Sequence, residues 1–139
     1  MDPIRALALV FTLVFSTSTW ADVQTKTIAE GLEYPWTLAF LPDGGYLVTE
    51  RVGRLRQITA DGQVSEPLAG LPEILIKSQG GLMGLLLAQD FEQTGTLFLT
   101  YAVGSAEDNT TRLARARLID GALRDFEIIF TARPNRTRP

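Results

Sequence analysis

The chain has 139 residues, of which 45% are hydrophobic and 21% are charged, and its 13 Lys and Arg against 16 Asp and Glu give a net charge of −3. This composition is too apolar for a disordered chain and too mixed in charge for a polybasic nucleic-acid binder. The sequence contains neither Cys nor His. Disulfides, thiolate metal sites and catalysis by an imidazole of this chain are therefore excluded.

Residues 1–21 have the layout of a secretory signal peptide. Arg5 supplies a positive charge, residues 6–15 form an uninterrupted apolar run, and mostly small residues lead to Ala21. The apolar run is too short for a membrane anchor, which needs about 20 residues. We expect cleavage after Ala21, a mature chain of residues 22–139 without a membrane segment, and a periplasmic or secreted protein.

Short runs in which apolar residues alternate with other residues predict β-strands in the rest of the chain, and no helix is expected. Turn sequences rich in Asp and Gly, such as Asp61-Gly62 and Asp120-Gly121, separate these runs. In the run 96–101, the alternation places Leu97, Leu99 and Tyr101 on one face. The expected strands lie at 36–41, 45–50, 54–59, 63–68, 82–88, 96–102, 110–118 and 122–130.

The expected strands form two similar sets of four. Each set opens with a strand that is apolar on both faces, and its last two strands are joined by an Asp-Gly turn. A repeat of about 40 to 50 residues is typical of propeller blades. The sequence therefore predicts an all-β fold made of two four-stranded antiparallel blades of an incomplete β-propeller, since a propeller closes with roughly 4–8 blades. The alternative is an eight-stranded β-sandwich that closes on itself.

Blade topology places the longer connections at one end of such a fold. The turn 50–53, the link 70–81 and the loop 103–110 fall at this end, called the mouth below, and the Asp-Gly turns fall at the other. In the link, Gln79 can donate and accept hydrogen bonds, and Gly80-Gly81 would let a flat ligand approach the backbone. The alternative is that the two glycines only make the turn into the next strand.

Several segments together resemble the glucose/sorbosone dehydrogenase family, the soluble aldose dehydrogenases that depend on pyrroloquinoline quinone. The resemblance covers most of residues 28–130 in consistent order, and it implies a six-bladed propeller with the quinone at the mouth, of which this chain is the first third or so. The segments that carry it are Gly31 to Gly44 (GLEYPWTLAFLPDG), Leu47 to Arg51 (LVTER) with Gly53-Arg54-Leu55, Gly70-Leu71-Pro72 and Gln79-Gly80-Gly81-Leu82.

The resemblance implies an enzyme that oxidises the anomeric carbon of an aldose. A His takes the proton of the anomeric hydroxyl, a hydride passes to the quinone, calcium polarises the quinone, and an external acceptor receives the electrons. Gln79 matches the family's glutamine that contacts the quinone. The catalytic His, the calcium ligands and the cationic residues that bind the quinone belong to later blades. No catalytic or metal-binding residue is therefore expected here, and this chain alone is expected to be inactive.

Two segments depart from the family pattern. Ala88-Gln89-Asp90-Phe91 stands where His-Pro-Asp-Phe is usual, and residues 132–139 show no resemblance, so that we expect a non-native or disordered tail. Arg51 lies in a matching motif, but its simplest role is a salt bridge to Glu50 or to a neighbouring blade.

The residues also leave two other interpretations open. One is an exported β-sandwich that binds a carbohydrate or a protein, in which Tyr34, Trp36 and Tyr101 stack on sugars. The other is a propeller assembled from several copies of the chain.

Overall fold

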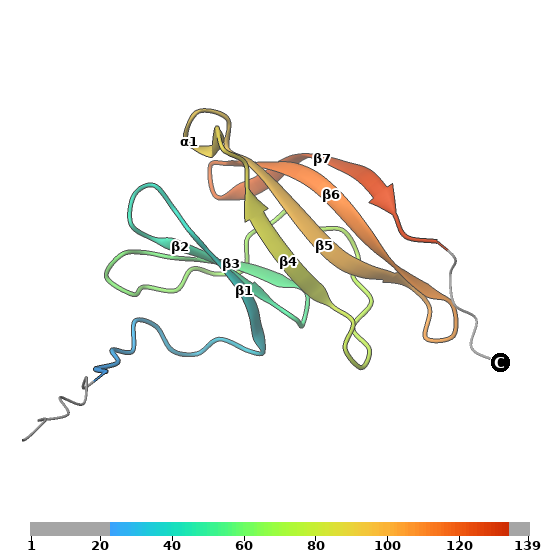
Figure 1. Ribbon diagram of the computed structural model, residues 1–139, viewed down its shortest axis with the longest axis horizontal. Helices are drawn as coiled ribbons and strands as arrows, with labels where there is room; N and C mark the ends of the chain where they lie inside the picture. The colour runs from blue at the N-terminus through green and yellow to red at the C-terminus, as the bar shows by residue number, and fades with distance from the viewer. Residues whose placement is uncertain (1–22, 134–139) are drawn as a thin grey trace, which may run out of the picture.

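The computed structural model describes residues 23–133. Residues 1–22 and 134–139, with the expected signal peptide and most of the expected tail, lie outside the described residues. The described part forms two antiparallel sheets in the orders β1-β2-β3 and β4-β5-β6-β7 (Figure 1). The elements are β1 Pro35–Phe40, β2 Tyr46–Glu50, β3 Arg54–Ile58, β4 Leu82–Leu87, α1 Phe91–Thr94, β5 Thr96–Gly104, β6 Asn109–Ile119 and β7 Ala122–Thr131.

The predicted all-β class and the two up-and-down antiparallel units are confirmed, but the first unit has three regular strands instead of four. The segment 63–68, expected as the fourth strand, still runs beside β3 and makes one isolated bridge, between Ile58 and Val64. The Ser65 hydroxyl accepts the Gln57 amide at 3.0 Å, in the place of a backbone carbonyl. Pro67 has no N–H to donate, so a regular ladder cannot continue through it.

A single helical turn, α1, connects β4 and β5 where only a turn was expected. Gly95 ends it in the left-handed conformation (φ 68°), and its N–H donates to the Phe91 carbonyl at 2.7 Å. The turn is too short to change the fold class. Among residues 23–133, no helix has the length and apolar character needed to cross a membrane.

The hydrophobic core lies between the two sheets. Leu47 and Leu55 of the first sheet contribute to it and are completely buried. Leu97, Leu99 and Tyr101 of β5 are at most 1% exposed, so the face predicted for that strand is confirmed. Burial of this shared face is what holds the two blades together.

The outward faces of both sheets remain open. On β1, Leu38 is 49% and Phe40 is 74% exposed, and on the second sheet Leu86 is 66% and Phe130 is 59% exposed. A sandwich that closes on itself would bury its apolar residues in one core and leave polar residues outside. The sandwich interpretation is therefore wrong for the described residues, and the open faces are those of blades.

The two blades share an irregularity of strand pairing, which supports the internal repeat. The first strand of each blade departs from regular pairing near its start, between Pro35 and Thr37 in β1 and between Leu82 and Leu85 in β4. In each case a threonine hydroxyl of the second strand accepts a hydrogen bond from a backbone amide of the first strand. Thr49 Oγ1 accepts the Thr37 N–H at 3.0 Å, and Thr100 Oγ1 accepts the Gly84 N–H at 2.8 Å.

Thr49 has a second role, because its hydroxyl also donates to the carbonyl of Met83 on β4 at 2.7 Å. Thr49 itself is completely buried. One hydroxyl group therefore satisfies a polar group of its own blade and another of the neighbouring blade.

Replacing Thr49 by Val should destabilise the chain by about 1–3 kcal/mol, because the Thr37 amide and the Met83 carbonyl would lose a partner in the interior. Thr49→Ser keeps the hydroxyl and loses one methyl group, which costs about 1 kcal/mol. Urea unfolding followed by circular dichroism measures both. Equal stability of Thr49→Val and the parent chain would contradict a structural role for this hydroxyl.

Candidate functional site

The link 70–81 lies between the β2–β3 turn and the β5–β6 loop, as predicted for the mouth. The Leu75 N–H donates to the Ala102 carbonyl at 2.9 Å, and Lys77 Nζ donates to the Ala106 carbonyl at 3.4 Å. In Figure 1 the β5–β6 loop and the turn that leads into β4 lie at the lower end, and α1 and the β6–β7 turn lie at the upper end. The predicted separation of the longer connections from the Asp120-Gly121 turn is confirmed.

Gln79 lies at this mouth, in a tight turn of the link. The Gly80 N–H closes the turn by donating to the Lys77 carbonyl at 2.8 Å. Gln79 is exposed and borders a hollow of about 660 Å³ between the link and the β5–β6 connection. The other residues that line the hollow are Leu75, Lys77, Ser78, Gly80, Ala102, Ala106, Glu107 and Asn109.

The close packing around Gly80 and Gly81 explains why both positions are glycines. Gly81 has a φ of 150°, and a Cβ there would overlap the carbonyl oxygen of Arg51. That carbonyl accepts the Leu82 N–H at 3.2 Å. A Cβ on Gly80 would lie 3.2 Å from the Cβ of Ala102. For Gly81, the structure thus supports the interpretation that the glycine lets the chain turn into the strand past its neighbour.

Arg51 connects the β2–β3 turn to the link. Its guanidinium carbon lies 5.0 Å from the centre of the Tyr34 ring, and its Nη1 donates to the Ser78 carbonyl. The expected salt bridge from Arg51 to Glu50 is wrong, because Glu50 pairs with Arg54. The alternative expectation, a salt bridge from Arg51 to a neighbouring blade, is not met within residues 23–133 either, because the partner of the guanidinium is the backbone carbonyl of Ser78 in the link.

Glu50 belongs to a cluster of three charged side chains at the end of β2. Arg54 Nε donates to Glu50 at 2.7 Å and Arg54 Nη2 to Glu33 at 2.8 Å. The hydrogen bond to Glu50, followed by that to Glu33, raises the pKa of Arg54 above its usual value. Glu50 is completely buried and also accepts the backbone N–H of Glu33. With its carboxylate held by these donors, Glu50 ties the segment before β1 to the sheet.

The three aromatic residues considered for sugar stacking do not form one surface. Tyr101 is completely buried, and its ring centre lies 5.9 Å from that of Phe126. Tyr34 is covered on one face by Arg51, while Trp36 is 51% exposed on β1. A sugar platform that includes Tyr101 is therefore wrong.

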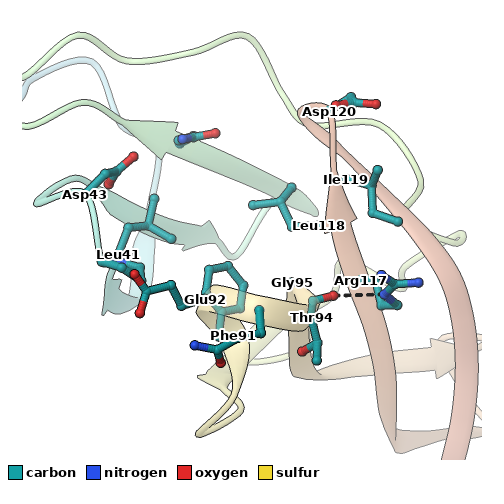
Figure 2. Close-up of a pocket in the computed structure, with 13 residues that line it drawn as sticks. Leu41, Asp43, Phe91, Glu92, Thr94, Gly95, Arg117, Leu118, Ile119 and Asp120 are labelled. Atoms are coloured by element: carbon teal, nitrogen blue, oxygen red, sulfur yellow. Dashed lines mark hydrogen bonds between the residues drawn. The ribbon is translucent and has the colours of Figure 1, made fainter.

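A second hollow, also of about 660 Å³, lies at the end opposite the mouth (Figure 2). Asp43 of the β1–β2 turn, Glu92 of α1 and Asp120 of the β6–β7 turn border it. Arg117 Nε donates to the Thr94 carbonyl at 2.8 Å. The acidic residues do not gather into a metal site. Within residues 23–133, no group of three or more Asp, Glu, His or Cys could hold a metal ion.

The sequence patterns did not connect Tyr34 or Ser78 with Arg51. Part of this contact follows from strand register. Once β1 and β2 form a hairpin, Pro35 lies opposite Glu50, so Tyr34 comes beside Arg51. The Ser78 contact depends on the path of the link, which no periodicity describes.

Comparison with known proteins places the chain in a family. The sequence model of the glucose/sorbosone dehydrogenases matches residues 32–139. The chain belongs to the glucose/sorbosone dehydrogenase family. The match includes the tail 132–139, which carries none of the motifs named above, and Ala132 donates its N–H to the Thr111 carbonyl of β6 at 2.9 Å.

The chain spans only about a third of the length of the relatives it matches. The aldose sugar dehydrogenase YliI of Escherichia coli K12 is 37% identical over 94% of this chain and 37% of the relative. A glucose dehydrogenase crystal structure is 39% identical, with a TM-score of 0.75 over 79% of this chain and 33% of its own. The PQQ-bound aldose sugar dehydrogenase of Streptomyces coelicolor is 29% identical, with a TM-score of 0.67 over 78% of this chain and 33% of its own.

Replacing Gly81 by Ala should displace the link, because the new Cβ has no room beside the Arg51 carbonyl. Gly121→Ala is the matched control, since Gly121 also has a positive φ (72°) but nothing within 4 Å of an added Cβ. The free energy of unfolding of the control should fall by about 1–2 kcal/mol from the left-handed backbone alone. In Gly81→Ala it should fall by more. Urea unfolding measures the stability of both variants. Equal losses of stability would contradict the close approach of Gly81 to the Arg51 carbonyl.

Proposed function

We propose that residues 22–139 form the first two blades of an exported, quinone-dependent aldose dehydrogenase. Gln79 is the residue of this chain that contacts pyrroloquinoline quinone. The observation that carries the proposal is the exposed Gln79 turn at the mouth, within a segment that matches the family. The PQQ-bound relative and the aldose sugar dehydrogenase of E. coli support the choice of cofactor and substrate class.

The residues at the mouth suit this cofactor chemically. Pyrroloquinoline quinone carries carboxylates and carbonyl oxygens. The hollow offers the amide of Gln79, which can donate and accept, and the ammonium group of Lys77. When bound, the quinone accepts the hydride from the anomeric carbon of the aldose. In the proposed site Gln79 orients the cofactor.

Calcium needs several oxygen ligands that converge on one point. Residues 23–133 bring together no group of three or more Asp, Glu, His or Cys that could hold a metal ion, so in this proposal the calcium ligands come from the remaining length that the relatives have. The chain also has no His. The proton of the anomeric hydroxyl would therefore need an acceptor from the remaining length that the relatives have, and an external acceptor would receive the electrons.

The isolated mature chain, residues 22–139, should show no sugar dehydrogenase activity, because it has no imidazole to accept the proton. The measurement is dye reduction after addition of pyrroloquinoline quinone, calcium and glucose, compared with boiled protein. Turnover above the boiled control would contradict this expectation.

A chimera tests the function itself. In the E. coli aldose sugar dehydrogenase, the segment that aligns with this chain is replaced by residues 22–139, which should preserve quinone- and aldose-dependent dye reduction. Gln79→Ala in the chimera should weaken quinone binding about tenfold, as expected for one lost hydrogen bond. Gln63→Ala is the matched control, since Gln63 is exposed beside the Asp61-Gly62 turn.

The chimera gives two distinct negative results. An inactive but folded chimera would argue against a dehydrogenase role for this chain. An active chimera in which Gln79→Ala binds the quinone as tightly as Gln63→Ala would refute the assignment of Gln79.

A further inference from the structure

We infer that Arg51 is a positioning residue, which holds the turn that presents Gln79. The inference rests on the proposed function in one respect, the contact between Gln79 and the cofactor. The contacts of Arg51 with the turn all lie within the described residues.

The turn that presents Gln79 has an uncommon backbone conformation. Ser78 has a positive φ of 52°, a backbone state that is uncommon for a residue with a side chain. The backbone bond from Gly80 to Lys77 closes the turn around Ser78 and Gln79. A turn with such a residue persists only when other contacts stabilise it, and the Ser78 carbonyl is the group that Arg51 binds.

Arg51 is itself fixed by contacts of both its backbone and its side chain. Its N–H donates to the Tyr34 carbonyl at 3.0 Å, and its own carbonyl accepts the Leu82 N–H at 3.2 Å. Its guanidinium lies over the Tyr34 ring. Because the backbone and the side chain are both fixed, the guanidinium offers the Ser78 carbonyl a donor in a defined place.

The bond from Arg51 also affects the backbone orientation of Gln79. The Ser78 carbonyl and the Gln79 N–H belong to the same peptide plane. The bond from Arg51 therefore sets the orientation of the peptide that leads into Gln79. Arg51 acts on the glutamine through the backbone, and the geometry requires no contact between Arg51 and the cofactor.

The two contacts of the Arg51 side chain require an arginine rather than a lysine. A guanidinium is planar, so it can stack on an aromatic ring while its N–H groups donate at the edge. A lysine ammonium carries the same charge without this planar fork. Arg51→Lys should therefore behave like Arg51→Ala at this turn, whereas a purely electrostatic role would be preserved by Lys.

The first test measures amide hydrogen exchange of the chain by mass spectrometry. Arg51→Ala and Arg51→Lys should speed exchange in the peptide that covers residues 77–82 by about tenfold, since a charge-assisted hydrogen bond is lost. Peptides from β6 and β7 should be unchanged. Arg124→Ala, which removes an exposed arginine of β7, is the control and should leave residues 77–82 unaffected. Unchanged exchange at 77–82 in both Arg51 variants would overturn the inference.

The second test is a double-mutant cycle for quinone binding in the chimera. Arg51→Ala should weaken binding about tenfold when Gln79 is present, and it should have no further effect when Gln79 is already Ala. Additive losses would overturn the inference, because Arg51 would then act on the quinone independently. If Gln79→Ala alone has no effect, the assignment of Gln79 fails and the link to the cofactor fails with it, while the exchange experiment still decides whether Arg51 holds the turn.

Discussion

The hydroxyl group of Thr49 is the contact on which the arrangement of the two blades depends. It accepts the Thr37 amide where β1 leaves regular pairing, and it donates to the Met83 carbonyl of the next blade. A hydrophobic core can tolerate small sliding motions, but a buried hydrogen bond has a narrow range of distance and angle. The Leu-rich interface therefore supplies the attraction between the blades. The Thr49 hydroxyl, together with the bond from the Leu82 N–H to the Arg51 carbonyl, restricts how the blades can slide against each other.

The position of the mouth follows from this arrangement of the blades. The Arg51 carbonyl accepts the Leu82 N–H, and the Gly81 carbonyl accepts the Ala102 N–H at 3.0 Å, so the chain entering β4 is bound on both sides. The link just before it must pass close to the first blade, and Gly81 is the residue that permits this approach. Gln79 is thus presented by a short turn whose following residues are held by both blades. Such support is what a residue that orients a ligand requires.

Much of the fold could be predicted from the sequence, since alternation and Asp-Gly turns identified the strands whose inner faces are buried. The prediction failed where single residues change backbone pairing. Pro67 and the Ser65 hydroxyl prevent a regular fourth strand. The spacing of Phe126, Ile128 and Phe130 in β7 predicts that all three share one face. They do not, because the pairing with β6 shifts between Leu113, opposite Phe130, and Ala114, opposite Ile128. The position of Gln79 in the link made it a candidate, but only the resemblance linked it to a quinone. The bond from Arg51 to Ser78 spans 27 residues, and no sequence pattern connects the two.

Burial at equivalent positions shows why hydropathy alone could not define the core. Leu38 of β1 pairs with Val48, and Leu85 of β4 pairs with Leu99, and each of these partners precedes the threonine that accepts an amide from the first strand. Yet Leu38 is 49% exposed and Leu85 only 8%. The residue types and local geometries are alike, and the difference is that the first blade covers Leu85. Exposure of a blade residue is therefore decided by which neighbour covers its face, a property of the assembled repeat rather than of the strand.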